Sequence, residues 1–232
     1  AGWFLAHWMT HGAPPMDATS VDSRRFGAWA DRDYRVAKAE ECFGLQFGVH
    51  YPYEERPAAR DVRTSPLHHL MLERGAVMGV AHGWERPNWF SDRQGDSAEL
   101  SFARPNWFTH VRRECRTVSE AVAMADLSIF SKFRVTGPGT ESFLSALGAN
   151  TPTRPGRIGL THALTPAGGV LSEFTVGRMG QDGAYLTSAA AAEEIDLDLL
   201  NTRAKNHDVT VQNVTEQIAV IGLMGPRAHR VL

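Results

Sequence analysis

Two segments of the chain share one pattern, a strand followed by a Gly-Pro turn and a helix, and this repeat limits the possible folds. The first copy is Phe133-Arg-Val-Thr-Gly-Pro-Gly-Thr with Phe143-Leu144, and the second is Ile221-Gly-Leu-Met-Gly-Pro-Arg-Ala with Val231-Leu232. Proline suits the first position of a helix, so each Gly-Pro pair predicts a strand-to-helix turn. We therefore expect an α+β domain assembled from two related halves, of which the second is cut short.

Strand and helix patterns alternate along the rest of the chain, which predicts a mixed α/β fold. We expect helices over residues 2–11, 31–43, 65–75, 107–117, 138–147 and 190–205, and strands over 76–81, 121–125, 133–136, 157–163, 170–178, 184–187, 209–213 and 218–224. Residues 45–50 are expected to be extended, and residues 51–64 to form a loop. Both ends of the chain look unfinished, so we expect a piece of a longer polypeptide.

Residues 84–106 are polar and rich in turn formers, and we expect them to be irregular and to hold the domain boundary. The predicted units are residues 1–95 and 96–232. Arg-Pro-Asn-Trp-Phe occurs twice in this region, at 86–90 and 104–108. We interpret the two copies as aromatic anchors that pin irregular backbone onto a core.

Composition excludes several classes of function. The 232 residues carry a net charge of −2, which is unlike the basic surface of a nucleic-acid binder. No run approaches the roughly 20 apolar residues that span a bilayer, so no membrane partner is expected. The two cysteines, Cys42 and Cys115, have no metal or disulfide spacing, which favours a reducing compartment such as the cytoplasm. We expect Cys42 to be buried in packing.

No sequence motif identifies a catalytic residue or a metal site. The chain has ten histidines, but no H-x-x-x-H with an acidic partner, and no G-x-S-x-G. Gly137-Pro138-Gly139 lacks the spacing of a dinucleotide-binding loop, so we interpret it as a turn. The catalytic residues therefore stay unknown, and no metal is expected.

One carboxylate has a pattern that suits ligand binding. In residues 168–176, period-two alternation places Val170, Phe174 and Val176 on one face, and Glu173 on the other with Leu171 and Thr175. A carboxylate on a rigid strand can accept paired N–H donors from a heterocycle. A solvated glutamate on an exposed face fits the same pattern, so both interpretations remain.

A series of collinear motifs resembles the central region of the dimethylglycine and sarcosine dehydrogenase family. The motifs are Ser65-Pro-Leu67, Gly75-Ala-Val-Met-Gly79, Gly83-Trp-Glu-Arg-Pro-Asn-Trp-Phe90, Asn106-Trp-Phe108, Leu160-Thr-His-Ala-Leu-Thr-Pro-Ala-Gly-Gly169, Ser172-Glu-Phe-Thr-Val176, Asn213-Val-Thr-Glu216 and Met224-Gly-Pro226. They run in order across essentially the whole chain. The resemblance implies the tail of an FAD-dependent oxidoreductase domain and a connector over residues 1–95. Residues 96–232 would form the N-terminal part of a folate-binding domain like the aminomethyltransferase (T-protein) of glycine cleavage.

The resemblance also implies a reaction, its cofactors and a site. An N-methylated glycine, dimethylglycine or sarcosine, would be oxidised by hydride transfer to FAD, and tetrahydrofolate would capture the one-carbon unit. FAD would be bound mainly by residues missing from this chain. Glu173, Phe174 and Thr175 match the family's folate-binding strand, with Glu173 at its acid. The partners would be the amine substrate and folate, with the electron acceptor unknown, and the location cytoplasmic, or the mitochondrial matrix in a eukaryote.

The sequence departs from the pattern of T-protein, which favours the dehydrogenases, and two alternatives stay open. T-protein has Asp where Glu173 stands, and its folate-contacting Tyr and Asn correspond to Leu160 and Ala189. The family's nucleotide-binding motif and the histidine that tethers its FAD are not found in this sequence, and its later folate-contacting residues would lie beyond Leu232. We therefore expect an incomplete folate site and no activity from this chain alone. One alternative is a flavin-free, folate-dependent aminomethyl- or methyltransferase. The other is a structural connector in which Glu173 is inert.

Overall fold

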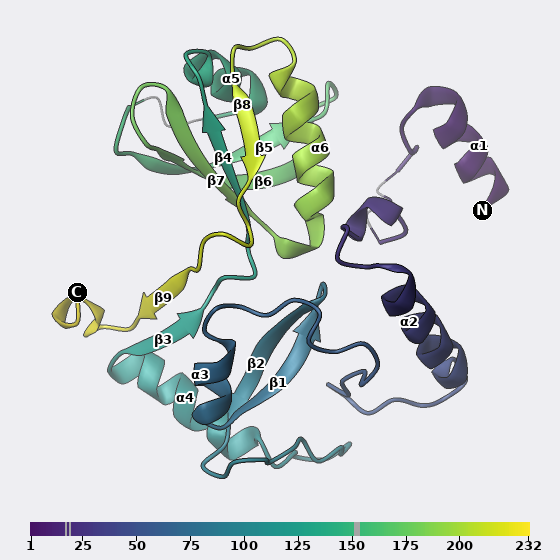
Figure 1. The fold of residues 1–232 in the computed structure, drawn as a ribbon, viewed down its shortest axis with the longest axis vertical. Coiled ribbons are helices and arrows are strands. Elements are labelled where there is room, and N and C mark those ends of the chain that lie inside the picture. Colours follow the sequence, from purple (N-terminus) through teal and green to yellow (C-terminus); the bar gives the residue numbers. More distant parts are fainter. Residues whose placement is uncertain (17, 19, 151–153) are drawn as a thin grey trace.

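The computed structural model describes residues 1–16, 18, 20–150 and 154–232, and it confirms a mixed α/β fold (Figure 1). The helices are α1 (Gly2–His11), α2 (Arg32–Leu45), α3 (His68–Glu73), α4 (Phe108–Glu120), α5 (Thr140–Leu147) and α6 (Glu193–Ala204). Short 3-10 helices are η1 (Ser23–Arg25), η2 (Ala190–Ala192) and η3 (Ala228–Arg230). The strands are β1 (Ala76–Ala81), β2 (Trp84–Phe90), β3 (Ala123–Asp126), β4 (Ser131–Thr136), β5 (Ile158–Leu164), β6 (Val170–Arg178), β7 (Gly183–Ser188), β8 (Thr210–Asn213) and β9 (Ile221–Met224).

The main core lies on one face of a five-stranded antiparallel sheet with the order β5-β6-β7-β4-β8. Helices α5 and α6 cover this face, at the top of Figure 1. The core cluster is Phe133, Val135, Phe143, Leu144, Leu147, Ala163, Phe174, Val176, Ala184, Leu186 and Leu200. Strand residues in this cluster alternate with residues on the opposite face, as the pleat requires.

The first Gly-Pro pair makes the expected turn between β4 and α5. Gly137 has a φ of 133°, and a Cβ atom there would lie 2.4 Å from the carbonyl oxygen of Asp208. Only glycine fits this approach of two backbones without strain. The turn therefore fixes where α5 starts and how it packs on the sheet.

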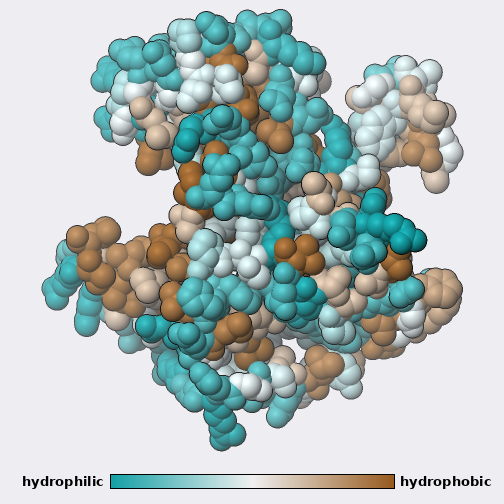
Figure 2. All heavy atoms as spheres, in the orientation of Figure 1, coloured by the Kyte–Doolittle hydropathy of each residue, from teal (hydrophilic) through white to brown (hydrophobic). Residues whose placement is uncertain are grey.

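The second half of the repeat forms a separate structure. Strand β9 pairs with β3, outside the five-stranded sheet, and the chain then continues into η3 instead of an α-helix. Exposed apolar side chains gather here, and Figure 2 shows them as a brown area at the C-terminal end. They include Met124, Ile221 and Val231, which are 72%, 53% and 62% exposed.

The segment after Trp84 corrects the expectation of irregular structure. Residues Trp84–Phe90 form β2, which pairs with β1. The pairing has a bulge, because Val77 lies opposite Trp89 whereas Met78 lies opposite Pro87. Proline is tolerated at such a bulge, so the Pro-containing sequence does not break the strand. Trp89 of the first copy is almost fully buried, as expected of an anchor, and so is Trp84, which lies just before that copy. In the second copy, the Asn106 side chain holds the chain at Ser97 and Glu99.

Three further expectations were wrong in detail. Helix α2 continues through Gly44 to Leu45, so residues from 45 onward are not an extended segment. Cys42 is exposed, not packed, because α2 buries none of its residues. Val170 is 63% exposed, because a bulge sets it opposite Leu164 and breaks its alternation with Phe174. In the part of the chain that the structure describes, no helix has the length and apolar character needed to cross a bilayer.

Candidate functional site

The hairpin of β5 and β6 presents Glu173 on the sheet face opposite the core. In its register, Leu160 lies across from Thr175 and His162 lies across from Glu173. The residues between them, Thr161 and Phe174, have no exposed surface and point the other way. Glu173 and Thr175 therefore share one face, and Phe174 belongs to the core beneath them.

The Glu173 carboxylate has one side-chain partner among the described residues. His162 Nε2 lies 3.0 Å from Glu173 Oε2, and the two side chains are 36% and 58% exposed. A carboxylate has acceptor positions for about four hydrogen bonds, so this contact leaves most of them free. Glu173 can accept further N–H donors from outside the chain.

Apolar surface adjoins this carboxylate. Ile158 and Leu160 are 76% and 48% exposed on the same face of β5. The residue opposite Ile158 is Gly177, which has no side chain to rise above the sheet. An exposed aliphatic surface beside a carboxylate suits a planar heterocycle that has N–H groups on one edge.

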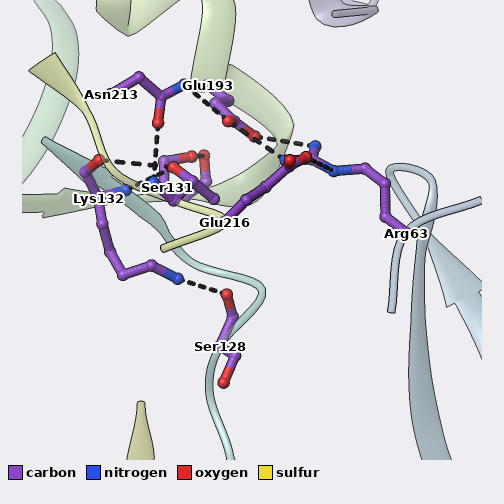
Figure 3. A network of polar contacts seen from close by, with 9 residues as sticks. Arg63, Ser128, Ser131, Lys132, Glu193, Asn213 and Glu216 are labelled. Atoms are coloured by element: carbon purple, nitrogen blue, oxygen red, sulfur yellow. Dashed lines mark hydrogen bonds and ion pairs between the residues drawn. The ribbon is translucent and has the colours of Figure 1, made fainter. Parts of the chain in front are cut away.

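A second polar cluster lies where the segment 62–66 meets the main sheet. Figure 3 shows Arg63 extending from that segment toward Glu193 and Glu216. Arg63 Nη1 lies 2.9 Å from Glu193 Oε2, and Asn213 Nδ2 donates to Glu193 Oε1 at 2.8 Å. Arg63 Nε and Glu216 Oε1 lie 3.2 Å apart and form an ion pair, but this pair lacks the geometry of a hydrogen bond.

Trp84 contacts the cation of this cluster. The Arg63 guanidinium carbon lies 4.2 Å from the centre of a Trp84 ring, a cation–π contact. Residues 62–66, Trp84, Ser128, Thr215, Glu216 and Ile218 line a cavity of about 400 Å³ beside it. Arg63 therefore connects the early part of the chain to the sheet domain through a buried ion pair.

Lys132 is the other buried cation of this region. Its side chain has no exposed surface, and Nζ donates to the carbonyl oxygen of Ser128 at 2.5 Å (Figure 3). Burial lowers the pKa of Lys132, and the nearby carboxylates of Glu193 and Asp126 oppose that shift. This ammonium sits inside the fold, so we assign it no contact with a ligand.

Sequence patterns did not reveal His162, Arg63 or Lys132. The spacing between His162 and Glu173 is a usable signal, because the hairpin turn at Gly168-Gly169 lies between them. Arg63 and Glu193 are 130 positions apart, and no local pattern links them. Among the described residues, no group of three or more His, Cys, Asp or Glu side chains could hold a metal ion.

Comparison with known proteins assigns most of the chain to one family. The profile of the GCVT N-terminal domain matches residues 67–232. The chain belongs to the GCVT N-terminal domain family. The profile of the FAD dependent oxidoreductase central domain matches residues 11–65, directly before this GCVT region. The resemblance found in the motifs is thereby confirmed.

Curated relatives and a solved structure agree with this assignment. Human mitochondrial dimethylglycine dehydrogenase is 36% identical over the whole chain, which spans 27% of that protein's length. Human mitochondrial sarcosine dehydrogenase is 28% identical over the whole chain, which spans 30% of its length. The aminomethyltransferase T of the glycine cleavage system from Bartonella henselae shares the fold, with a TM-score of 0.58 at 22% identity over 73% of this chain and 42% of that one. The chain spans about a quarter of the dimethylglycine dehydrogenase it matches.

Proposed function

We propose that this chain is part of a flavin-dependent dehydrogenase that oxidatively demethylates an N-methylated glycine and passes the one-carbon unit to tetrahydrofolate. The supporting observation is the order of the two profiles, an FAD oxidoreductase segment at 11–65 followed by the GCVT region at 67–232. Similarity to dimethylglycine dehydrogenase over the whole chain supports the same order. Dimethylglycine and sarcosine are the proposed substrates, and the division of the chain after residue 95 stays a prediction.

The exposed face of the β5–β6 hairpin is the proposed folate contact. Glu173 would accept two N–H donors from the edge of the pterin ring, because its carboxylate is 58% exposed and keeps free acceptor positions. Leu160 and Thr175 would lie under the ring plane on the same face. Phe174 would act indirectly, by fixing β6 on the core.

The residues of this chain carry no flavin step in this proposal. The chain contains no G-x-G-x-x-G motif, so its residues do not fit a dinucleotide-binding loop and we derive no step through the flavin from them. When bound, FAD would accept the hydride removed from the N-methyl carbon. The contribution of residues 11–65 would be structural support, through contacts such as Arg63 with Glu193.

A flavin-free folate transferase is the second candidate, favoured by the fold shared with aminomethyltransferase T. One experiment separates the two. The full gene product is purified, its flavin spectrum recorded, and dimethylglycine and then sarcosine are added without oxygen. Loss of the oxidised flavin absorbance supports the dehydrogenase. A protein without flavin supports the transferase, and a bound flavin that neither amine reduces contradicts our proposal.

Folate binding is tested by substitution at the hairpin. Glu173→Gln replaces one acceptor oxygen by a donor and is expected to weaken tetrahydrofolate binding about tenfold or more. Glu120→Gln, an exposed glutamate at the end of α4, is the matched control and should leave affinity unchanged. Equal affinity of both variants would leave Glu173 as an inert surface residue.

A further inference from the structure

The contact between His162 and Glu173 has features of a built pair. Both residues lie on strands that are held by the core, since their neighbours Thr161 and Phe174 are fully buried. The backbone carbonyl of His162 also accepts a hydrogen bond from the Ala149 amide at 3.0 Å. The imidazole therefore projects from a rigid position directly opposite Glu173.

A glutamate on an exposed face has three side-chain torsions and few restraints. The imidazole of His162 is the less exposed of the two side chains, at 36% against 58%, and it has only two torsions. The 3.0 Å contact binds Oε2 and leaves Oε1 and one acceptor position of Oε2 directed elsewhere. This arrangement selects one orientation of the carboxylate before a ligand arrives, which lowers the entropy cost of binding.

We propose that His162 is a positioning residue for the folate site, which holds the Glu173 carboxylate through an Nε2–H donor so that it can accept two N–H groups of the pterin edge. This inference rests on the proposed folate contact of Glu173. His162 itself touches no ligand in this arrangement. Its tautomer places hydrogen on Nε2, because the carboxylate can only accept.

The test compares two amides at position 162 in the full gene product. The side-chain amide nitrogen of Gln extends to about the place of the imidazole Nε2, whereas that of Asn reaches only to the place of Nδ1. His162→Gln should bind tetrahydrofolate within about twofold of the wild-type protein. His162→Asn should bind it about fivefold more weakly, which corresponds to the net value of one ordinary hydrogen bond. Thermal melts of both variants verify that the hairpin remains folded.

A double-mutant cycle gives the decisive readout. In a Glu173→Ala background, His162→Asn should have no further effect on tetrahydrofolate affinity, because the group it positions is gone. The same fivefold loss in both backgrounds, or no loss in either, overturns the positioning role while leaving the folate site intact. If Glu173→Ala itself binds tetrahydrofolate like the wild type, both the proposed folate contact and this inference fail.

Discussion

Arg63→Met is expected to destabilise the protein strongly, because it leaves a buried carboxylate without its cation. Glu193 is only 9% exposed at its side chain and receives two hydrogen bonds from Arg63 and one from Asn213. Removing one partner of a buried ion pair typically costs about 3 to 5 kcal/mol. The lost contact with the Trp84 ring adds about 1 kcal/mol. We expect the free energy of unfolding to fall by about 5 kcal/mol.

Urea unfolding followed by tryptophan fluorescence measures this loss. Glu216→Gln is the matched control, since Glu216 pairs with the same guanidinium but is 67% exposed and should cost less than about 1 kcal/mol. The double variant Arg63→Met, Glu193→Met should recover most of the lost stability, because an apolar pair carries no desolvation penalty. Arg63→Met unfolding within about 1 kcal/mol of the wild type, or like Glu216→Gln, would refute the buried-pair reasoning.

Three further predictions concern the core and two carboxylates. Phe174→Ala should lower the free energy of unfolding by about 3 to 5 kcal/mol, because it removes a fully buried side chain from the core. Thr175→Ala, at an exposed position, should lower it by only about 0.5 kcal/mol. Equal losses of the two variants in urea unfolding would contradict the assigned faces. Burial raises the pKa of Glu85, but hydrogen bonds from Arg60 and the Asp61 amide outweigh it, so the folded-state pKa lies below the ordinary 4.5. This carboxylate's stabilisation is thus present above about pH 4.5 and lost as the pH falls further, and Glu85→Gln should flatten the acid limb of stability against pH. Burial raises the pKa of the Asp196 carboxyl above the ordinary 3.8, so the stability that this group contributes is present below about pH 3.8 and is lost as the pH rises through its folded-state pKa. Asp196→Asn should therefore lose less stability than the wild type over that rise in pH, and parallel thermal-melt curves of the two proteins would count against this.

Much of the fold follows from local patterns. The alternation within residues 170–178 predicts that Phe174 and Val176 face the core and that Glu173 and Thr175 face away, as the structure shows. The Gly137-Pro138 turn likewise identifies where β4 ends and α5 begins. These features depend on side-chain period and backbone conformation, which neighbouring residues determine.

Irregular segments were harder to predict. The residues of β2 contain Pro87 and read as a loop, yet pairing with β1 and a bulge make them a strand. Period-two alternation predicts that Val170 shares a face with Phe174, but the bulge at the start of β6 places it on the exposed side. A bulge is set by the partner strand, so a single strand's sequence does not show it.

The sequence by itself determined the family, the faces of the strands and the choice of Glu173 as the exposed carboxylate. Only the tertiary structure decided what that carboxylate contacts and how the two matched regions are joined. His162 meets Glu173 through strand register, and Arg63 meets Glu193 across 130 positions of chain. The physical reason is that periodicity fixes the direction of a side chain, whereas its partner depends on the register and packing of distant segments.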